Sequence, residues 1–385
     1  MNEIVIFSTA DWDAEFWTNK QHMAMLFAKY GYRVLYVDSL GLRRPALKSK
    51  DLRRMLQRLN KALPYPRYVH ANIWRVSPLV IPFQNNRLVR VCNEAILRAS
   101  IKFSMNFLGM RRPIILTYNP TIANLCVSLP HSALIYHCVD DLRAAPHVDG
   151  SAIEAGERRL GEVADLCFAT SPVLQQRMGI FFAKSIYEPN VCNPELFGAA
   201  KSGKLQEPGD LKNIPHPRAI FVGALSQYKV DFKLLKDVSS RLKHIHFIII
   251  GAEGEGQPDS CSAPRAENIH ILGSKNYTVL PAYMGHCSCA ILPAPHNEYT
   301  ASMFPMKFFE YLAAGLPVVS TNLPSLQEFS NICFLSDGVD EFCRSIEKVL
   351  SGERPDSAEV SRICKVHSWE ERFKRMLIEI ETLDS

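Results

Sequence analysis

The sequence predicts an α/β protein built from two Rossmann-like, doubly wound domains. The chain has 385 residues, more than one ordinary core accommodates, which favours two domains. Short apolar runs alternate with segments of helical periodicity, an order typical of parallel sheets. That alternation stops in a stretch rich in Gly, Lys, Pro and Asp and then starts again. We expect residues 1–196 and 218–366 to form two domains that face each other across a cleft, joined by a linker at 197–217.

The first domain opens with a strand, a loop, a helix ended by Gly31, and a second strand, which predicts parallel pairing. Further elements follow in the same style. The predicted strands are 4–7, 34–38, 73–76, 113–117, 133–137 and 166–169, and the predicted helices are 21–29, 87–106, 154–163 and 171–178. The loop after the first strand lacks the glycine fingerprint of a dinucleotide site, so NAD is not the expected ligand of this half.

The second domain repeats the pattern. Its predicted strands are 218–222, 247–250, 269–273, 289–293, a run from Val318, and 333–335. Helices are expected from Asp231, at 280–284, from Pro305, and at 367–383. Ser368 and Glu371 have the spacing of a capping box at the start of the last helix.

The most informative stretch is the helix that we expect to begin at Pro305 and to end before Gly315. Phe304 would then occupy the cap position without an oxygen to offer, and Lys307 would lie at the positive end of the helix dipole. Phosphate is the anion that such helix ends usually bind. Glu310 lies three residues after Lys307 and could accept hydrogen bonds from ribose, so the pair describes a nucleotide site. The alternative is a solvated Lys–Glu pair on the surface of an amphipathic helix.

Composition narrows the classes of protein. Apolar residues make up 47% and charged residues 22%, as in soluble globular proteins. No apolar run reaches 18 residues, and the N-terminus lacks a basic leader, so neither a membrane span nor a signal peptide is expected. The eleven cysteines form no paired C-x-x-C clusters, so we expect no metal site, and reduced thiols favour a cytoplasmic location.

The net charge is +5, and much of it gathers between Leu42 and Tyr68, where nine basic residues face only Asp51. Leucines interleave at partly helical spacing, which suits an anionic membrane surface or nucleic acid. The alternative is a solvated helix that covers the core. The stretch from Arg43 to Lys61 has no interleaved aromatic residues, which argues against single-stranded nucleic acid.

The chain resembles the two-domain GT-B glycosyltransferases, in particular the group 1 (family four) enzymes of bacterial polysaccharide assembly. The stretch from Pro305 to Val319, PMKFFEYLAAGLPVV, is similar to their donor-binding signature. Three other segments resemble parts of the family, residues 221–225, 283–293 and 368–372. The last of these lies in the predicted C-terminal helix (367–385), which in the family crosses back to the first domain. Residues 136–141 and 164–171 are similar to teichuronic-acid and exopolysaccharide glucuronosyltransferase-like sequences.

The resemblance implies that the second domain binds a UDP- or GDP-linked sugar. Glu310 would hold the ribose and Lys307 the pyrophosphate, while Gly223 would let the backbone approach the phosphates. Tyr283 would lie near the base, and Met306 belongs to the same donor-binding set. Two positions depart from the family pattern: Ser302 replaces a glutamate, and Ala224 replaces an arginine, with the matching lysine absent or displaced to Lys229. A retaining or an inverting transfer therefore both stay open.

An inverting transfer needs a general base for the acceptor hydroxyl. Strand ends aim side chains at the ligand edge of a parallel sheet. The predicted catalytic residues there are Asp140 and Asp141, with His137 and Asp13 as further candidates. The alternative is that Asp140 and Asp141 cap the next helix.

The expected acceptor is a glycan or a lipid-linked saccharide at the inner face of the plasma membrane. The basic segment 43–67 would dock the first domain on anionic lipid, and no nucleic acid and no cofactor beyond the donor are expected. Two other functions stay open, a sugar-nucleotide epimerase on the same scaffold and a non-catalytic nucleotide-sugar- or lipid-binding relative. An epimerase would act on the donor alone.

Overall fold

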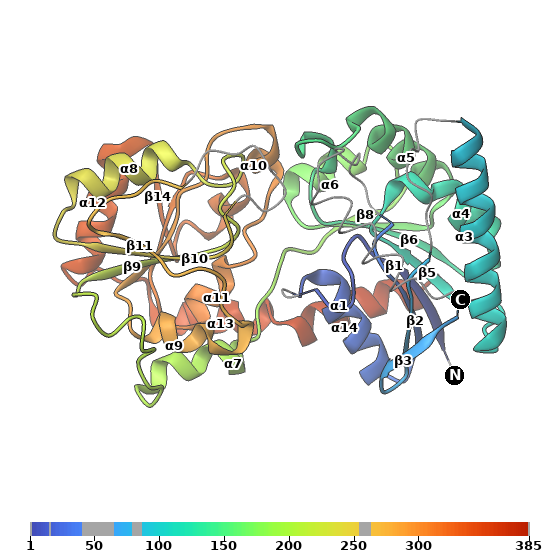
Figure 1. Cartoon of the computed structure of the whole chain (residues 1–385), viewed down its shortest axis with the longest axis horizontal. Helices are drawn as coiled ribbons and strands as arrows, with labels where there is room; N and C mark the ends of the chain where they lie inside the picture. Colours follow the sequence, from blue (N-terminus) through green and yellow to red (C-terminus); the bar gives the residue numbers. More distant parts are fainter. Residues whose placement is uncertain (1, 15–16, 41–64, 79–86, 254–262, 384–385) are drawn as a thin grey trace. The chain divides into compact units, whose positions relative to one another are not determined.

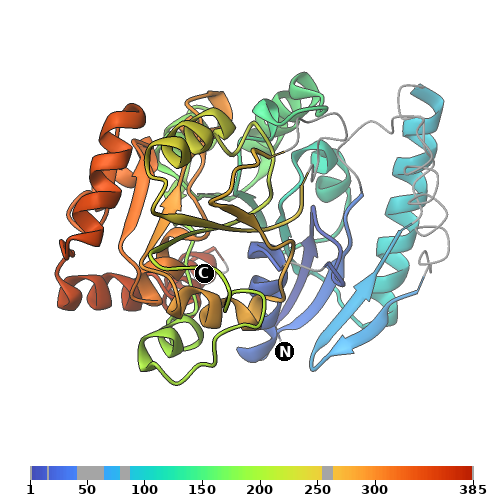
Figure 2. The same cartoon turned by 60° about the vertical axis from the view of Figure 1, so that its left-hand side comes forward.

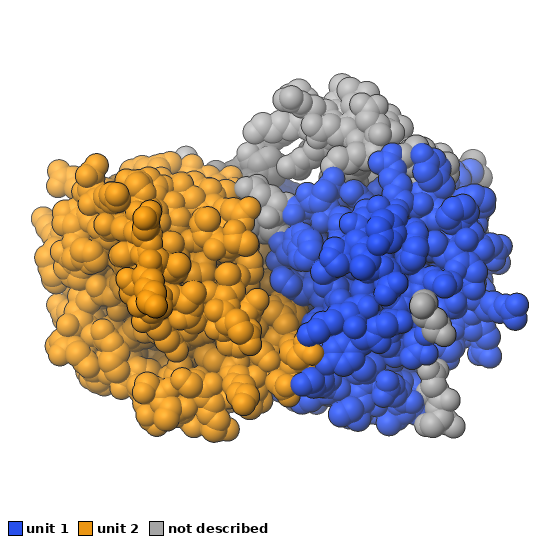
Figure 3. Space-filling model, turned by 90° about the horizontal axis from the view of Figure 1, so that it is seen from below, with its two compact units in different colours: residues 1–188, 373–385 blue, residues 189–372 orange. Residues whose placement is uncertain are grey.

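The computed structural model describes residues 2–14, 17–40, 65–78, 87–253 and 263–383. The chain divides into two compact units, residues 1–188 with 373–385 (unit 1) and residues 189–372 (unit 2), which are coloured separately in Figure 3. Each unit contains one largely parallel sheet with helices on both faces. The expected α/β class with two doubly wound sheets is therefore confirmed.

Unit 1 contains an eight-stranded sheet in the order β3-β4-β2-β1-β5-β6-β7-β8. All neighbouring strands are parallel except β3 and β4, which are antiparallel. Both faces of the central strands are buried, which explains why their sequences read as continuous apolar runs. The strands are β1 (Glu3–Phe7), β2 (Arg33–Val37), β3 (Arg67–His70), β4 (Ile73–Val76), β5 (Ile114–Thr117), β6 (Leu134–Cys138), β7 (Leu166–Ala169) and β8 (Ser185–Tyr187).

Helices cover both faces of the unit 1 sheet (Figures 1 and 2). On one face, Val5 and Leu35 join a core cluster with residues of α3 (Arg87–Phe107), α4 (Ala123–Ser128), α5 (Gly150–Val163) and α6 (Pro172–Met178). On the other, α1 (Asn19–Lys29) packs Phe27 edge-on against Phe373 of α14 (Trp369–Glu381), with ring centroids 4.9 Å apart.

Unit 2 contains a six-stranded, fully parallel sheet in the order β11-β10-β9-β12-β13-β14. One face packs against α8 (Phe232–Arg241) and α12 (Gly338–Leu350), the other against α9 (Leu280–Gly285), α11 (Phe308–Ala313) and α13 (Ser357–Val366), as Figure 1 shows. The strands are β9 (Arg218–Val222), β10 (His246–Ile250), β11 (Ile269–Ile271), β12 (Cys289–Leu292), β13 (Val318–Thr321) and β14 (Phe334–Ser336).

The predicted linker at 197–217 lies inside unit 2. It begins within α7 (Pro194–Gly198), and Phe197, Leu211 and Ile214 are buried in the same core cluster as α11. Its Gly and Pro residues do mark turns, but the apolar residues between them bury enough surface to hold the segment on the domain. The C-terminal helix α14 begins in unit 2 and continues in unit 1 from Phe373 onward.

Several elements escaped the sequence analysis. Strands β3 and β8 are short and carry mixed polarity, and α12 and α13 were not assigned. Most of the predicted basic segment, from Arg43 to residue 64, lies outside the described residues. No helix in the described part of the chain is both long and apolar enough to cross a membrane.

Candidate functional site

The helix expected at Pro305 begins three residues later, at Phe308, with Lys307 at the cap position. The reason lies in the carbonyl of Phe304, which accepts a hydrogen bond from the side chain of Asn190 at 2.7 Å. The Phe308 N–H therefore bonds to the Pro305 carbonyl in a tight turn, at 3.1 Å. Because β13 follows α11 in a fully parallel sheet, α11 runs opposite to the strands. Its first residues consequently lie toward the carboxyl edge of the unit 2 sheet.

Glu310 is the centre of a buried polar cluster. Its side chain is 3% exposed, and its Oε2 accepts a hydrogen bond from the Lys307 ammonium at 2.7 Å. Its Oε1 accepts from the hydroxyl of Tyr277, which precedes α9, at 3.0 Å. The Lys307 Nζ also lies 5.0 Å from the centroid of the Tyr277 ring. A solvated surface pair is thereby excluded, since the carboxylate is buried.

Burial raises the pKa of Glu310, while the charge and the hydrogen bond of Lys307 and the hydroxyl of Tyr277 oppose the rise. Burial also raises the pKa of Tyr277, and the neighbouring Glu310 charge adds to that. Lys307 keeps 21% of its side chain exposed. The cluster therefore combines an accessible cation with a carboxylate shielded from water.

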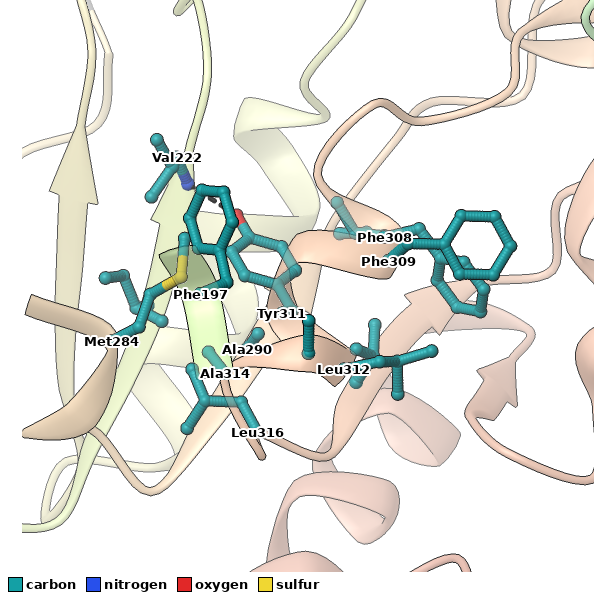
Figure 4. Packing of buried hydrophobic residues seen from close by; sticks show 14 of the residues in the cluster. Phe197, Val222, Met284, Ala290, Phe308, Phe309, Tyr311, Leu312, Ala314 and Leu316 are labelled. Atoms are coloured by element: carbon teal, nitrogen blue, oxygen red, sulfur yellow. Dashed lines mark hydrogen bonds between the residues drawn. The ribbon is translucent and has the colours of Figure 1, made fainter. Parts of the chain in front are cut away.

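The α11 helix contacts the end of strand β9. The Val222 N–H donates to the hydroxyl of Tyr311 at 2.7 Å, the hydrogen bond drawn in Figure 4. Gly223 follows directly, and its carbonyl oxygen would lie 1.9 Å from a Cβ added at Gly251. Gly251 also has a φ of +153°, so only glycine allows these two strand ends to approach so closely.

The two other predicted donor-binding residues, Met306 and Tyr283, lie in different surroundings. Met306 is half-buried and lies in the turn directly before Lys307. Tyr283 instead donates its hydroxyl to Asp210 at 2.8 Å, and Asp210 pairs with Lys275 at 2.7 Å. Among the described residues, no hydrogen bond or ring contact joins Tyr283 to Lys307 or Glu310, so the structure assigns it to a separate cluster.

In unit 1, Asp141 follows strand β6 and is a structural cap. It is the N-cap of a short 3-10 helix, Leu142–Ala144, where it accepts a hydrogen bond from the Arg143 N–H. The guanidinium of Arg143 donates to both of its carboxylate oxygens, at 3.1 and 2.9 Å, and Arg177 lies 3.5 Å away. Arg177 in turn binds the wholly buried Glu157 at 2.7 Å. The capping interpretation therefore holds for Asp141.

Two other predicted catalytic residues of unit 1, His137 and Asp140, differ in how deeply they are buried. His137 is fully buried, with its Nδ1 3.2 Å from the Tyr118 hydroxyl and its ring beside Phe168. The imidazole of His137 is therefore part of the packed interior of unit 1. Asp140 is half-buried and directly precedes the capping residue.

Asp13 lies with a different group, at the ends of strands β1, β2 and β4. Its carboxylate is 3.3 Å from the guanidinium of Arg75, which also pairs with Asp38 at 2.5 Å. Asp38 further accepts from the Trp12 N–H at 2.8 Å and from the Ser77 hydroxyl. Asp13 and Asp140 thus follow different strands of the unit 1 sheet, β1 and β6.

Sequence analysis missed Tyr277 and Tyr311. Tyr277 is 33 positions from Glu310, and no local pattern links the two. Tyr311 lies within the signature, but the sequence analysis gave it no role of its own. Within the described ranges, no group of three or more His, Cys, Asp and Glu residues could hold a metal ion.

Comparisons with known proteins agree with this architecture. Residues 216–352 match the family model described as glycosyl transferases group 1. The match falls within unit 2 and includes Lys307 and Glu310. The whole-length similarity to solved structures, given below, shows the two-domain GT-B fold. The resemblance inferred from the signature is confirmed.

Individual related proteins share little sequence identity with this chain. The chain is 28% identical over 164 residues to TuaH of Bacillus subtilis (strain 168), a proposed teichuronic acid biosynthesis glycosyltransferase. That match covers 41% of this chain, and the chain spans about two fifths (41%) of the relative's length. Among solved structures, sucrose-phosphate synthase from Thermosynechococcus elongatus superposes with a TM-score of 0.75 at 14% identity, covering 100% of this chain and 99% of the other. Anabaena HepE in complex with UDP gives 0.65 at 13% identity, covering 99% and 100%.

Proposed function

We propose that the protein is a glycosyltransferase that moves a sugar from a UDP- or GDP-linked donor to a glycan or lipid-linked saccharide in bacterial polysaccharide assembly. The observation that carries the proposal is the buried Glu310, held 2.7 Å from Lys307 inside a group 1 glycosyltransferase domain. A buried carboxylate beside a partly exposed lysine supports a ligand that offers hydroxyls to one group and phosphate to the other.

In this proposal the donor lies along the carboxyl edge of the unit 2 sheet. Glu310 accepts hydrogen bonds from the ribose hydroxyls, and Lys307 leaves its intramolecular partner in part to bind the pyrophosphate. Gly223, at the end of β9, allows the backbone to approach the phosphates, and Met306 lines the same region. Tyr283, tied to Asp210, contributes through the packing of its cluster and not through a contact to the base.

The transfer forms a bond between the acceptor oxygen and the anomeric carbon and breaks the bond from that carbon to the diphosphate. The nucleoside diphosphate leaves with the bonding electrons, and Lys307 stabilises its negative charge. Unit 1 provides the residue that takes the acceptor proton. Asp140 is the proposed base, because Asp141 is occupied by Arg143 and His137 is buried.

The proposed acceptor is saccharide on a lipid carrier, and the proposed location is the cytoplasmic face of the plasma membrane. The name of the relative TuaH, from teichuronic acid biosynthesis, supports a cell-envelope polysaccharide. The basic sequence between Arg43 and Arg67 supports contact with anionic lipid.

The test is a thermal-stability screen against nucleotide sugars, followed by a transfer assay. A true donor raises the melting temperature by mass action, since ligand at about 100 times its Kd adds about 2.7 kcal/mol of stability. The stabilising donor is then incubated with and without bacterial lipid-linked saccharides. Consumption of the donor only with acceptor supports a transferase, whereas a changed sugar without acceptor indicates an epimerase. The absence of stabilisation by every UDP- and GDP-sugar would overturn the proposal.

A further inference from the structure

Helix α3 of unit 1 has an unusual exposed face. At about 100° per residue, its solvent-facing residues fall on one arc, and its buried residues, such as Leu97, Ile101 and Met105, fall on the opposite one. The exposed arc is mostly apolar, although a surface helix normally presents polar residues to water. Its members are Val91, Cys92, Ala95, Ile96, Ala99, Lys102, Phe103, Asn106 and Phe107, which we call the α3 face.

The large side chains of the α3 face are strongly exposed. Phe103 is 52% and Phe107 is 64% exposed, and the two rings stack with centroids 6.3 Å apart. Val91 and Ile96 are 59% and 40% exposed. The largest exposed apolar patch of a monomer is often functional, so this face is a candidate for contact with a partner or a membrane.

Charge favours a membrane over a second copy of the chain. The sequence of α3 contains four basic residues and one acidic residue, Glu94, which pairs with Arg98 at 3.0 Å, and both of these side chains are partly exposed. The α3 face itself contains Lys102 and no acidic side chain. Exposed Arg111 and Arg112 follow the helix. Two copies would bring like charges together, whereas anionic headgroups complement them.

The size of the α3 face also favours a membrane over a second copy of the chain. A helix of 21 residues is about 32 Å long. The α3 face runs from Val91 to Phe107, about 24 Å of that length, and at a helix width of about 10 Å it offers roughly 240 Å², well below the roughly 800 Å² per partner of a stable protein interface. The helix is not one that could span a bilayer, so it would lie in the headgroup region with its apolar face down.

We propose that the α3 face inserts into the surface of an anionic lipid bilayer and anchors unit 1 there. This inference rests on the membrane location proposed above, but it does not depend on transferase activity. It adds an apolar contact that salt does not screen to the electrostatic attraction of the basic segment. In Figures 1 and 2 the helix lies along one side of unit 1.

Cys92 allows a dye to be attached to the α3 face itself, because it is the one exposed cysteine among the described residues. The full chain, with Cys261 replaced by Ser, is labelled at Cys92 with an environment-sensitive nitrobenzoxadiazole dye. Vesicles of phosphatidylglycerol and phosphatidylcholine should shift the emission to the blue and raise it, while pure phosphatidylcholine should give a much smaller change. In sedimentation, the Phe103→Ser/Phe107→Ser variant should partition into the anionic vesicles about tenfold less at 0.5 M salt.

Ile180→Ser is the matched control, since Ile180 is exposed to 75% but lies outside α3. It should partition like the parent protein. Failure to bind the vesicles, or binding that leaves the dye in a polar environment, overturns the inference. A concentration-dependent blue shift without vesicles, together with dimers by light scattering, would overturn it in favour of self-association. UDP- and GDP-sugar binding is measured on the same samples, so failure of the membrane contact is distinguished from failure of the proposed function.

Discussion

Each unit places a buried carboxylate near the carboxyl edge of its sheet, but the two carboxylates are held differently. In unit 1, the oxygens of Asp141 are engaged by the backbone and guanidinium of Arg143, and Arg177 adds a further contact that is itself braced by Glu157. In unit 2, Glu310 has one lysine and one tyrosine hydroxyl, and the lysine is partly exposed. Local structure provides the main partners of Asp141, whereas Glu310 is paired with a lysine that stays 21% exposed, as the proposed donor site requires.

The comparison indicates that burial alone does not identify a functional carboxylate. The two carboxylates differ in how far away in the sequence their partners lie and in how exposed those partners are. Arg143 is two residues from Asp141 and completes a helix cap, so the pair forms with the turn itself. Tyr277 reaches Glu310 from 33 positions away, so that contact exists only because the domain is folded. Four experiments could break or sharpen this contrast.

The largest effect is expected from substituting the two neighbouring aspartates of unit 1, Asp140 and Asp141, one at a time. Asp140→Asn should lower transfer by about 10²- to 10⁴-fold, the usual contribution of a general base, and should cost less stability than the Asp141 variant, because Asp141 carries the cap. Asp141→Asn should cost about 2–3 kcal/mol of unfolding free energy, because it weakens the compensation of Arg143 and Arg177. Urea unfolding and initial rates measure the two. Normal turnover of Asp140→Asn would remove that residue as the base.

The second experiment removes the cation of unit 2. Lys307→Ala should weaken binding of the stabilising nucleotide sugar by about 10- to 100-fold, because a charge-assisted contact to phosphate is lost. Isothermal calorimetry measures the affinity. Lys233→Ala is the matched control, since this lysine pairs with Asp237 at 2.9 Å on the exposed surface of α8. Equal affinity in the Lys307 variant and the control would exclude the phosphate role.

The third experiment is Tyr277→Phe, which removes one hydroxyl while keeping the ring beneath the Lys307 ammonium. Glu310 loses one of its two partners, so its position for ribose becomes less fixed, and donor affinity should fall by about fivefold to tenfold. Tyr68→Phe, at an exposed tyrosine of β3, should have no effect. An unchanged affinity in Tyr277→Phe would mean that Lys307 alone positions Glu310.

The smallest effect is a pH dependence. Because burial raises the pKa of Glu310, the group takes up its proton at a higher pH than an ordinary glutamate as the solution is acidified. The neutral acid is a weaker acceptor, so affinity for a nucleotide sugar should decline already above the usual glutamate range. Glu310→Gln should bind more weakly at pH 7.5 and show no such decline. A parallel decline in both proteins would assign the titration to another group.

Much of the fold followed from local chemistry. The apolar runs of β1, β9 and β10 are buried on both faces, and such strands read as continuous hydrophobic sequence. The turn glycines at Gly31 and Gly315 both have positive φ, as the helix-ending pattern predicted. The pairing of Lys307 with Glu310 also followed from spacing, since residues three apart share a helix face.

Tertiary structure decided the remainder. The start of α11 depends on Asn190, which captures the Phe304 carbonyl from 114 positions away, so no local rule places it. The segment 197–217 has the composition of a linker, yet Phe197, Leu211 and Ile214 are buried in the core cluster of α9 and α11, because burying their apolar side chains is favourable. The sequence by itself determined the class of fold and the Lys307–Glu310 pair, because both arise from spacing along a few residues. The burial of Glu310 against Tyr277 was decided only by the tertiary structure, because that contact joins segments 33 positions apart.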